Sequence, residues 1–234
     1  MAMADNPTAR LFLDLEGIAF DPLPCTINAV RRSMIRLGYP LRTDRDLSWI
    51  ARQPIQDTLE QLLPADEGLR GRFLALLRDY YCRQHWHAAR VEPGVPTLLH
   101  HMACDYDVER VVVSGNPTQT VARQLEDLGL DAVVDRILSP EQGGCANCRT
   151  RLVAECSAND DEPPTVWLTD LPGELTSARE LGITGIGALW GRISERRLRE
   201  SGDHVADSPE AVLASWPWLV ADASRDQGTR TATR

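Results

Sequence analysis

The sequence predicts an α/β protein in which a doubly wound parallel sheet carries an all-helical insertion after its first strand. Short apolar runs alternate with amphipathic segments between about residues 93 and 216, and this alternation is typical of a parallel sheet whose strands are connected by helices. Residues 22–91 lie between the first apolar run and this region, and they show only helical periodicity. The chain has 234 residues and 43% hydrophobic content, which is enough to bury a core of this size.

The N-terminal part of the chain predicts one strand followed by helical segments. Residues 1–9 are polar and are expected to be flexible, whereas the apolar run at 11–15 predicts the first strand. Apolar side chains recur every three or four residues from 27 to 37, before Gly38, and again over about 44–63 and 69–89. We therefore expect residues 22–91 to form a helical cap domain.

The rest of the chain predicts the remainder of a Rossmann-like core domain, formed by residues 10–21 and 92–220. A β-branched run predicts a buried strand at 108–113, and shorter strands are expected at 133–138, 165–168 and 185–189. Helical patterns occupy 95–102, 118–128, 149–155, 175–181 and 209–216. Residues 222–234 are polar and are expected to form a flexible tail.

The charge and composition favour chemistry on small molecules. A formal net charge of −9 argues against a nucleic-acid partner, because proteins with such partners gather positive charge against phosphates. All 25 basic residues are arginine, which excludes mechanisms that need a lysine amine. The chain has no apolar stretch long enough to cross a bilayer and no signal-peptide pattern, so we expect a cytoplasmic protein without a membrane partner.

The cysteines and a pair of histidines indicate neither a disulfide scaffold nor a zinc site. The six cysteines are few and scattered for a chain of this length. Cys145 and Cys148 form a single Cys-x-x-Cys pair without the second pair, or the suitably spaced histidines, that a zinc site requires. His85 and His87 are two residues apart, which places them on different faces of a helix. We interpret the Cys-x-x-Cys pair as two loop cysteines.

Small polar and acidic residues follow three of the predicted strands. They are Asp14 and Glu16 after the first strand, Ser114, Gly115 and Asn116 after the second, and Thr169 and Asp170 after the fourth. The carboxyl ends of parallel strands meet at one edge of a sheet, so these groups are expected to converge. Carboxylates suit Mg²⁺, and a hydroxyl at a helix N-terminus suits phosphoryl oxygens. The pattern therefore predicts a Mg²⁺-assisted site for a phosphate ester.

These residues stand in the order of the motifs of the haloacid dehalogenase-like hydrolases, and the chain resembles that superfamily over about residues 10–216. The helical insertion is similar to the cap of its phosphoglycolate-phosphatase-like branch. The strand that ends in Asp14-Leu-Glu16-Gly matches the first motif, and the resemblance implies that Asp14 forms an aspartyl phosphate while Glu16 acts as acid and base. Val-Val-Val-Ser114 matches the second motif, which implies that Ser114, Gly115 and Asn116 bind the phosphoryl group.

The resemblance also implies a basic residue and further acidic ones. Arg149 is the candidate for the basic third motif because residues 149–155 are similar to the family's basic residue and its following helix, and Arg151 is the alternative. Residues 169–174 match the acidic fourth motif. The implied Mg²⁺ ligands are Asp14, Glu16, Asp170 and Glu174, with Glu174 either a second ligand of that motif or an outer partner.

The chain departs from the family motifs at four positions. Glu16 and Glu174 stand where the family has Asp, Ile18 replaces Thr, and Thr169 replaces Gly. Glu16 also argues against the true dehalogenases, which carry an aromatic residue there, and against the phosphomutases, which carry Asp. The lack of lysine argues against the phosphonate-cleaving branch, which needs a cap lysine.

The resemblance implies a Mg²⁺-dependent phosphatase that hydrolyses a small phosphorylated metabolite through an aspartyl phosphate. Arg52 lies at a break between two helical patterns of the expected cap, and it is the candidate for substrate contact because cap loops of this family often reach the site. The alternative is a catalytically impaired protein of the same fold with a ligand-binding or regulatory role. The chain is expected to be a monomer or a homodimer.

Overall fold

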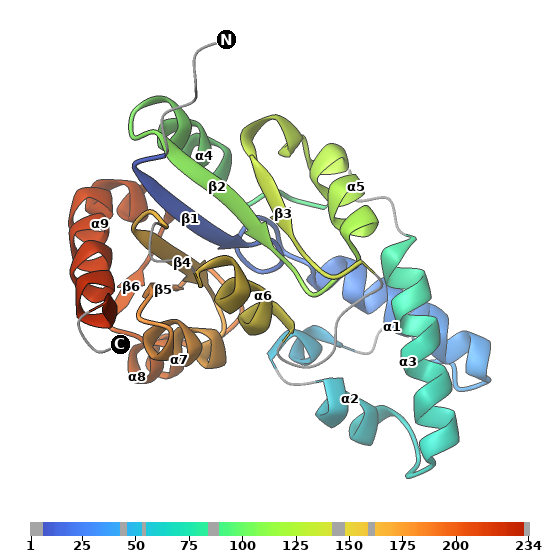
Figure 1. The fold of residues 1–234 in the computed structure, drawn as a ribbon. Coiled ribbons are helices and arrows are strands. Elements are labelled where there is room, and N and C mark those ends of the chain that lie inside the picture. The colour runs from blue at the N-terminus through green and yellow to red at the C-terminus, as the bar shows by residue number, and fades with distance from the viewer. Residues whose placement is uncertain are drawn as a thin grey trace. The chain divides into compact units, whose positions relative to one another are not determined.

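The computed structural model describes residues 7–42, 46–52, 55–83, 89–141, 148–158 and 162–231. The chain divides into two compact units. The sheet unit comprises Met1–Phe20 and Arg90–Arg234, and the helical unit comprises Asp21–Ala89. Figure 1 shows the elements of both units.

The sheet unit is built on a six-stranded sheet with the order β3-β2-β1-β4-β5-β6. Its strands are β1 (Ala9–Asp14), β2 (Val108–Val113), β3 (Arg136–Leu138), β4 (Thr165–Thr169), β5 (Thr184–Ala188) and β6 (His204–Ala206). Every neighbouring pair of these strands is parallel. The strand order runs outward from β1 in both directions, which confirms the doubly wound α/β fold class.

Helices cover both faces of the sheet (Figure 1). On one face, α4 (Val95–Cys104) packs against β2, and α9 (Pro209–Thr231) packs against α4 and β4. On the other, α6 (Cys148–Cys156) and α7 (Pro172–Glu180) cover a buried cluster that includes Phe12 and Trp167. The remaining helices are α5 (Thr118–Leu128) beside β3 and α8 (Glu195–Ser201) beside β5 and β6.

The helical unit has its own apolar core. Its elements are α1 (Leu23–Leu37), the 3₁₀ turn η1 (Ser48–Arg52), α2 (Ile55–Leu62) and α3 (Glu67–Cys82). Gly38 ends α1 with φ +85°, a left-handed conformation that glycine adopts without strain. Asp66 caps α3, because its side chain accepts a 2.8 Å hydrogen bond from the Leu69 amide. The core cluster joins all four elements and the segment before η1: Val30, Met34, Leu47, Ile50, Leu59, Leu63, Leu69 and Phe73.

The C-terminal expectation for residues 222–234 needs correction. Helix α9 continues to Thr231 rather than ending at residue 216. The reason is that Leu219 and Ala223 are buried and extend the stripe begun by Val212 and Trp216, at the spacing of one helix face. The sequence expectation also lacked α8 and β6, because β6 has only three residues and a run that short shows no clear periodicity.

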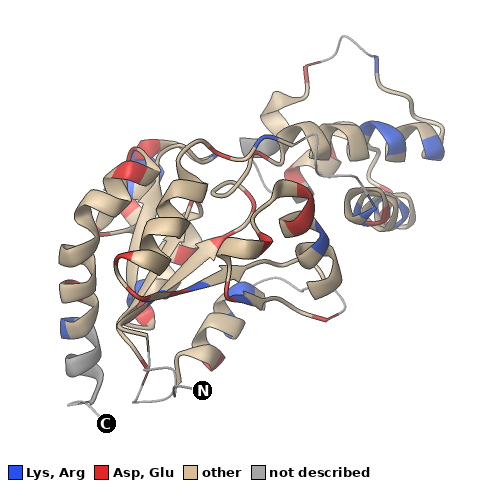
Figure 2. Ribbon diagram, turned by 90° about the horizontal axis from the view of Figure 1, so that it is seen from above, with Lys and Arg blue, Asp and Glu red and all other residues tan. Residues whose placement is uncertain are grey.

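The surface of the sheet unit carries charges of both signs. Acidic and basic residues are interspersed along its ribbon (Figure 2). Among the residues that the structure describes, no helix combines the length and the apolar character needed to cross a membrane.

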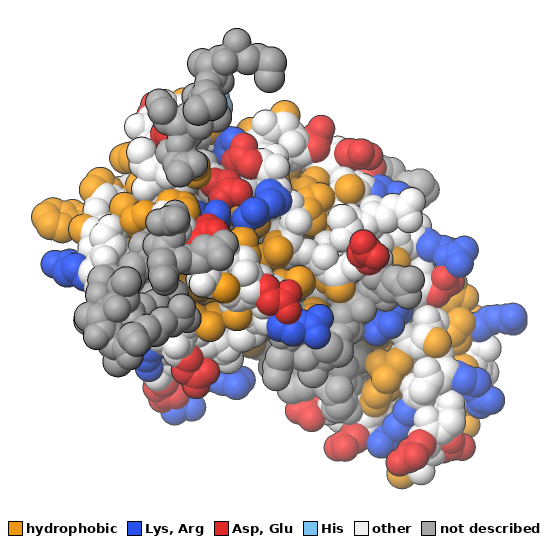
Figure 3. Space-filling view, viewed as in Figure 1, with side chains coloured by type: hydrophobic (Ala, Val, Ile, Leu, Met, Phe, Trp, Pro, Cys, Tyr) orange, Lys and Arg blue, Asp and Glu red, His pale blue; other side chains and the backbone are white. Residues whose placement is uncertain are grey.

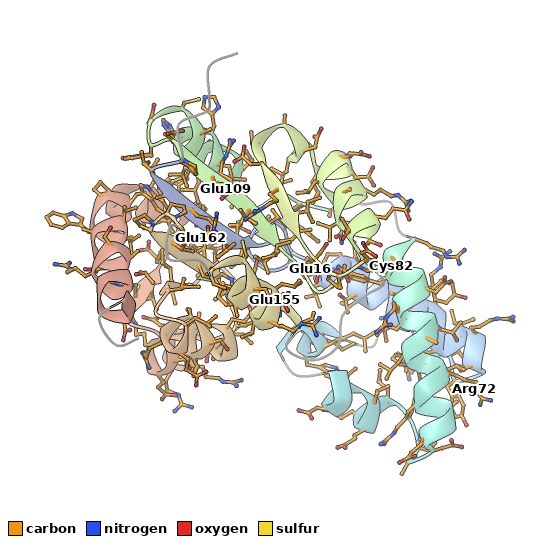
Figure 4. All side chains as sticks on the ribbon, in the orientation of Figure 1. Glu16, Arg72, Cys82, Glu109, Glu155 and Glu162 are labelled. Carbon is orange, nitrogen blue, oxygen red and sulfur yellow. The ribbon has the colours of Figure 1, made fainter. Side chains whose placement is uncertain are left out.

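A buried arginine is part of a mixed charge cluster on β1 and β2. Arg10 has a side chain that is only 7% exposed, and its guanidinium lies 2.5 Å from both Glu109 and Glu162. Burial works against the charged form of Arg10, but the hydrogen bonds that it donates to the two glutamates raise its pKa overall. Figure 3 shows acidic and basic side chains side by side over these strands, and Figure 4 labels both glutamates. Arg10 lies between the two carboxylates, and Arg136 adds a second cation 3.3 Å from Glu109, so the cluster stabilises the sheet through paired opposite charges.

Replacing Arg10 with Met is expected to destabilise the protein by about 2 kcal/mol, below the range for a fully buried pair because both glutamates are partly exposed. The physical reason is that Glu109 and Glu162 lose the cation between them. Urea denaturation at neutral pH measures the change. Arg196→Met, which removes an exposed ion pair with Glu200, is the control and should change stability by less than about 0.5 kcal/mol. Equal effects of the two substitutions would contradict this account.

Candidate active site

Asp14 lies at the carboxyl end of β1, between β2 and β4. Its side chain is fully buried. The Trp167 indole Nε1 donates a hydrogen bond to Oδ1 at 3.1 Å, and the Thr169 hydroxyl lies 2.6 Å from Oδ2. Both donors come from the neighbouring strand β4. Because each carboxylate oxygen has two lone pairs, each keeps one for an electrophile.

Arg149 and Glu174, which lie far from Asp14 in the sequence, complete this cluster. Arg149, in the first turn of α6, places Nη1 3.8 Å from Asp14 Oδ2 and Nε 2.6 Å from Glu174 Oε1. Burial disfavours its charge, but Asp14 and Glu174 together raise the pKa of Arg149. Arg151, the alternative basic residue, is 65% exposed and pairs with Glu155. The structure therefore brings Arg149, and not Arg151, to Asp14.

Thr169 links the two carboxyl groups. Its Oγ1 lies 2.8 Å from Glu174 Oε2 as well as 2.6 Å from Asp14 Oδ2, and it accepts a hydrogen bond from the Leu171 amide. One hydroxyl proton cannot serve both carboxylates, so the second contact needs a proton on a carboxyl group. Burial, followed by the charge of Asp14, raises the pKa of Glu174 well above its ordinary value, while Arg149 opposes this shift. We assign that proton to Glu174, which then donates to Thr169.

The raised pKa of Glu174 predicts a specific pH dependence of stability. At pH values between the pKa of Glu174 in the unfolded protein and its higher pKa in the folded protein, the native state holds a proton that the unfolded state has lost. The free energy of unfolding therefore falls as pH rises through that window. The contribution to the slope is at most about 1.4 kcal/mol per pH unit. Glu174→Gln cannot titrate, and it should show a flatter fall over the same window. Urea denaturation of both proteins across pH measures this, and parallel curves would contradict the assignment.

The loops after β1 and β2 bring Glu16 to Asn116. The Asn116 Nδ2 donates a 3.0 Å hydrogen bond to Glu16 Oε1, and the Asn116 amide donates to Ser114 Oγ at 3.1 Å. Ser114 is buried directly after β2, and Gly115 follows it beside Cys148. Figure 4 labels Glu16 near the ends of these strands. An acid and base candidate, a hydroxyl and an amide thus lie at the carboxyl edge that carries Asp14.

Asp170 has a different partner from the one expected. Arg192, in the loop after β5, donates from Nε to Asp170 Oδ2 at 3.0 Å, and the Asp170 side chain is fully buried. The sequence expectation missed both Arg192 and Trp167. The Gly191-Arg192 pair could have been found by applying the strand-end argument to the predicted strand at 185–189. No sequence pattern indicated a role for Trp167, because a tryptophan within an apolar strand is expected to be a core residue.

The acidic residues do not form a divalent-cation site in this arrangement. Within the described ranges, no group of three or more His, Cys, Asp or Glu side chains is placed to hold a metal ion. Oxygen ligands of the right type are present, since Asp14, Asp170 and Glu174 are all buried. Each of them already has an arginine partner, however, since Arg149 contacts Asp14 and the protonated Glu174, and Arg192 pairs with Asp170. The expected Mg²⁺ ligands, Asp14, Glu16, Asp170 and Glu174, are therefore not arranged to coordinate the ion in these side-chain conformations.

Four residues singled out in the sequence lie wholly or partly outside the described part of the chain. Arg52 ends η1 in the helical unit, and its side chain lies outside the described part of the chain. His85, His87 and Cys145 also lie outside the described residues. Cys148, interpreted as a loop cysteine, is instead the buried first residue of α6.

The fold is similar to that of several solved hydrolases and phosphatases. A haloacid dehalogenase-like hydrolase from Streptococcus pneumoniae matches with a TM-score of 0.73 at 20% identity, over 90% of this chain and 98% of the other. A predicted phosphatase from Clostridium acetobutylicum gives 0.75 at 18%, over 92% and 100%. A predicted phosphoglycolate phosphatase from Haemophilus somnus gives 0.71 at 17%, over 88% and 96%.

Comparisons with protein-family models and with curated proteins do not identify a family. No protein-family model and no curated protein matches the chain. The structural matches extend over nearly the whole length of both chains, so they include the sheet, the flanking helices and the helical insertion. The chain has the fold of the haloacid dehalogenase-like hydrolases, with a helical insertion as in these solved structures.

Proposed function

We propose that the chain is a phosphoric monoester hydrolase that acts on a small phosphorylated metabolite through a phosphoryl group carried on Asp14. The observation that carries this proposal is the buried Asp14 carboxylate at the end of the central strand, with the Arg149 guanidinium 3.8 Å away. The names of the structural neighbours, which include phosphatases, support the same reaction class. The resemblance of the motif order to the superfamily supports it as well.

Two displacements at phosphorus make up the proposed reaction. An Asp14 oxygen attacks, its bond to phosphorus forms, and the ester oxygen leaves with a proton from Glu16. Water then attacks the aspartyl phosphate, Glu16 takes one of its protons, and the bond from Asp14 to phosphorus breaks to release inorganic phosphate. Trp167 and Thr169 fix the nucleophile in place, because each donates to one of its oxygens.

Arginine side chains supply the positive charge in this proposal. Arg149 offsets charge on the transferring phosphoryl oxygens, and the Ser114 hydroxyl would donate to one of them. Mg²⁺, which the family resemblance implies, has no part in these steps, because the acidic residues already pair with Arg149 and Arg192. Glu16 carries one more methylene than the family's Asp, and its hydrogen bond from Asn116 fixes the position of that longer side chain.

Hydrolysis of p-nitrophenyl phosphate tests the proposal, followed by a panel of small phosphorylated metabolites. The assay is run once in EDTA and once in excess Mg²⁺, with Glu16→Gln as the companion variant. We expect turnover that falls about 10²-fold in Glu16→Gln. A folded wild-type protein that hydrolyses nothing on the panel under either condition would contradict the proposal.

A second candidate function is binding of a phosphorylated ligand without hydrolysis. It is favoured by the hydrogen bonds that already engage both Asp14 oxygens and the Glu16 carboxylate. Calorimetry with inorganic phosphate separates the two functions. Binding that is weakened by Arg149→Met, together with no turnover on the panel, would favour this second function.

A further inference from the structure

Arg192 makes an unusually complete set of contacts with the acidic edge of the sheet. Its backbone amide and its Nε donate to Asp170 Oδ2 at 2.9 Å and 3.0 Å. Its Nη2 donates to Asp170 Oδ1 at 3.4 Å and to the backbone oxygen of Glu16 at 3.3 Å. One guanidinium thus spans a buried carboxylate and a carbonyl from the loop after β1.

The backbone at Gly17 and Gly191 packs tightly against Asp170 and Arg192. A Cβ atom added to Gly17, which has φ +91°, would lie 2.6 Å from Asp170 Oδ2 and 2.9 Å from Arg192 Nε. A Cβ atom at Gly191 would lie 2.3 Å from the Asp170 Cβ. Only glycine fits at distances this short, so the loops after β1 and β5 pack directly on Asp170. The Arg192 side chain is 25% exposed and is fixed between these loops.

The oxygen atoms that Arg192 contacts are of the kind that bind divalent cations. A carboxylate and a backbone carbonyl are hard ligands, and Mg²⁺ requires them at about 2.0–2.1 Å. A guanidinium that hydrogen-bonds the same atoms fills the space next to them and carries a like charge. The two cations therefore exclude each other at this position.

We propose that the Arg192 guanidinium takes the place of a divalent cation, so that this chain does not bind Mg²⁺ at Asp170 and becomes able to do so when the Arg192 side chain is removed. This inference takes its location from the proposed phosphatase site. Its test measures metal binding and not turnover, so the failure of one proposal can be distinguished from the failure of the other. An inactive protein that excludes the metal would leave this inference intact, and an active protein that binds the metal would overturn only this inference.

The test compares wild type, Arg192→Ala and Arg192→Ala/Asp170→Asn, using thermal unfolding in EDTA and in saturating Mg²⁺ and Mn²⁺ titration followed by electron paramagnetic resonance. In Arg192→Ala we expect one bound Mn²⁺ per chain and a Tm that rises by roughly 5–10 °C in Mg²⁺. In wild type and in the double variant we expect no bound Mn²⁺ and no rise in Tm. Arg196→Ala, at an exposed position, is the matched control and should behave as wild type.

Two results would overturn the inference. One is a wild-type protein that binds one Mn²⁺ and loses it in Asp170→Asn, and this measurement does not depend on the stability of any Arg192 variant. The other is a folded Arg192→Ala protein that still binds no metal. If Arg192→Ala unfolds in EDTA because Asp170 has lost its cation, the inference predicts refolding on addition of Mg²⁺, and failure to refold would count against it.

Discussion

Replacing Asp14 with Asn is expected to abolish hydrolysis of p-nitrophenyl phosphate, with kcat lowered at least about 10³-fold. The amide is close in size to the carboxylate, but it is a poor nucleophile toward phosphorus and cannot form the aspartyl phosphate. It also removes the charge that faces Arg149 at 3.8 Å. Steady-state kinetics at saturating substrate measures the loss, and circular dichroism checks that the variant is folded.

The control for this substitution is Asp207→Asn, which changes the same functional group at an exposed position before α9. Its kcat should stay within about twofold of wild type, because exposed substitutions away from a site have small effects. If both Asp14→Asn and Asp207→Asn retained most of the wild-type activity, another residue would be the nucleophile. The proposed reaction would then be wrong.

The second large effect is expected from Arg149. Replacement with Met should lower kcat/KM about 10²–10³-fold, because the guanidinium that offsets charge on the phosphoryl group is lost. Arg149→Lys should recover only part of the activity, since a lysine ammonium cannot present the two separated nitrogens that now contact Asp14 and Glu174. Kinetics with p-nitrophenyl phosphate and a urea denaturation curve for each variant separate the loss of catalysis from the loss of stability.

Arg151→Met is the matched control for Arg149. It lies on the same helix, two residues further along, and its exposed side chain pairs only with Glu155 among the ion pairs described for it. It should leave kcat/KM within about twofold of wild type. A larger effect at Arg151 than at Arg149 would reverse the assignment of the basic residue.

The sequence was sufficient for the parts of the fold that depend on local pattern. Strand β2 and helix α5 were predicted with the bounds that the structure has, because a β-branched run and a clear amphipathic repeat each have a strong period. Strand β6 was not predicted because it has three residues. Helix α9 was predicted too short because Pro217, a residue that rarely lies inside a helix, and the polar residues after Ala221 concealed the buried Leu219 and Ala223.

The strand-end argument predicted the site residues whose short side chains follow a strand, whereas Arg149 was indicated by the family resemblance. Asp14, Ser114 and Asp170 are placed by the strand ends, so the order of strands and loops was enough to identify them. Arg149 and Arg192 act through long side chains, and their partners depend on how α6 and the loop after β5 pack. The sequence alone does not show that Arg192 reaches Asp170, so the ion pair between them was not predicted.

The most direct measurement of the central claim is the identification of the phosphorylated residue in an acid-quenched reaction. A single turnover with a phosphate ester is stopped in acid, and the peptides are analysed by mass spectrometry. The account predicts one phosphoryl group on the peptide that contains Asp14, formed within the time of turnover and absent from Asp14→Asn. Hydrolysis with the phosphoryl group on another residue, or with no phosphorylated peptide at any time, would contradict it.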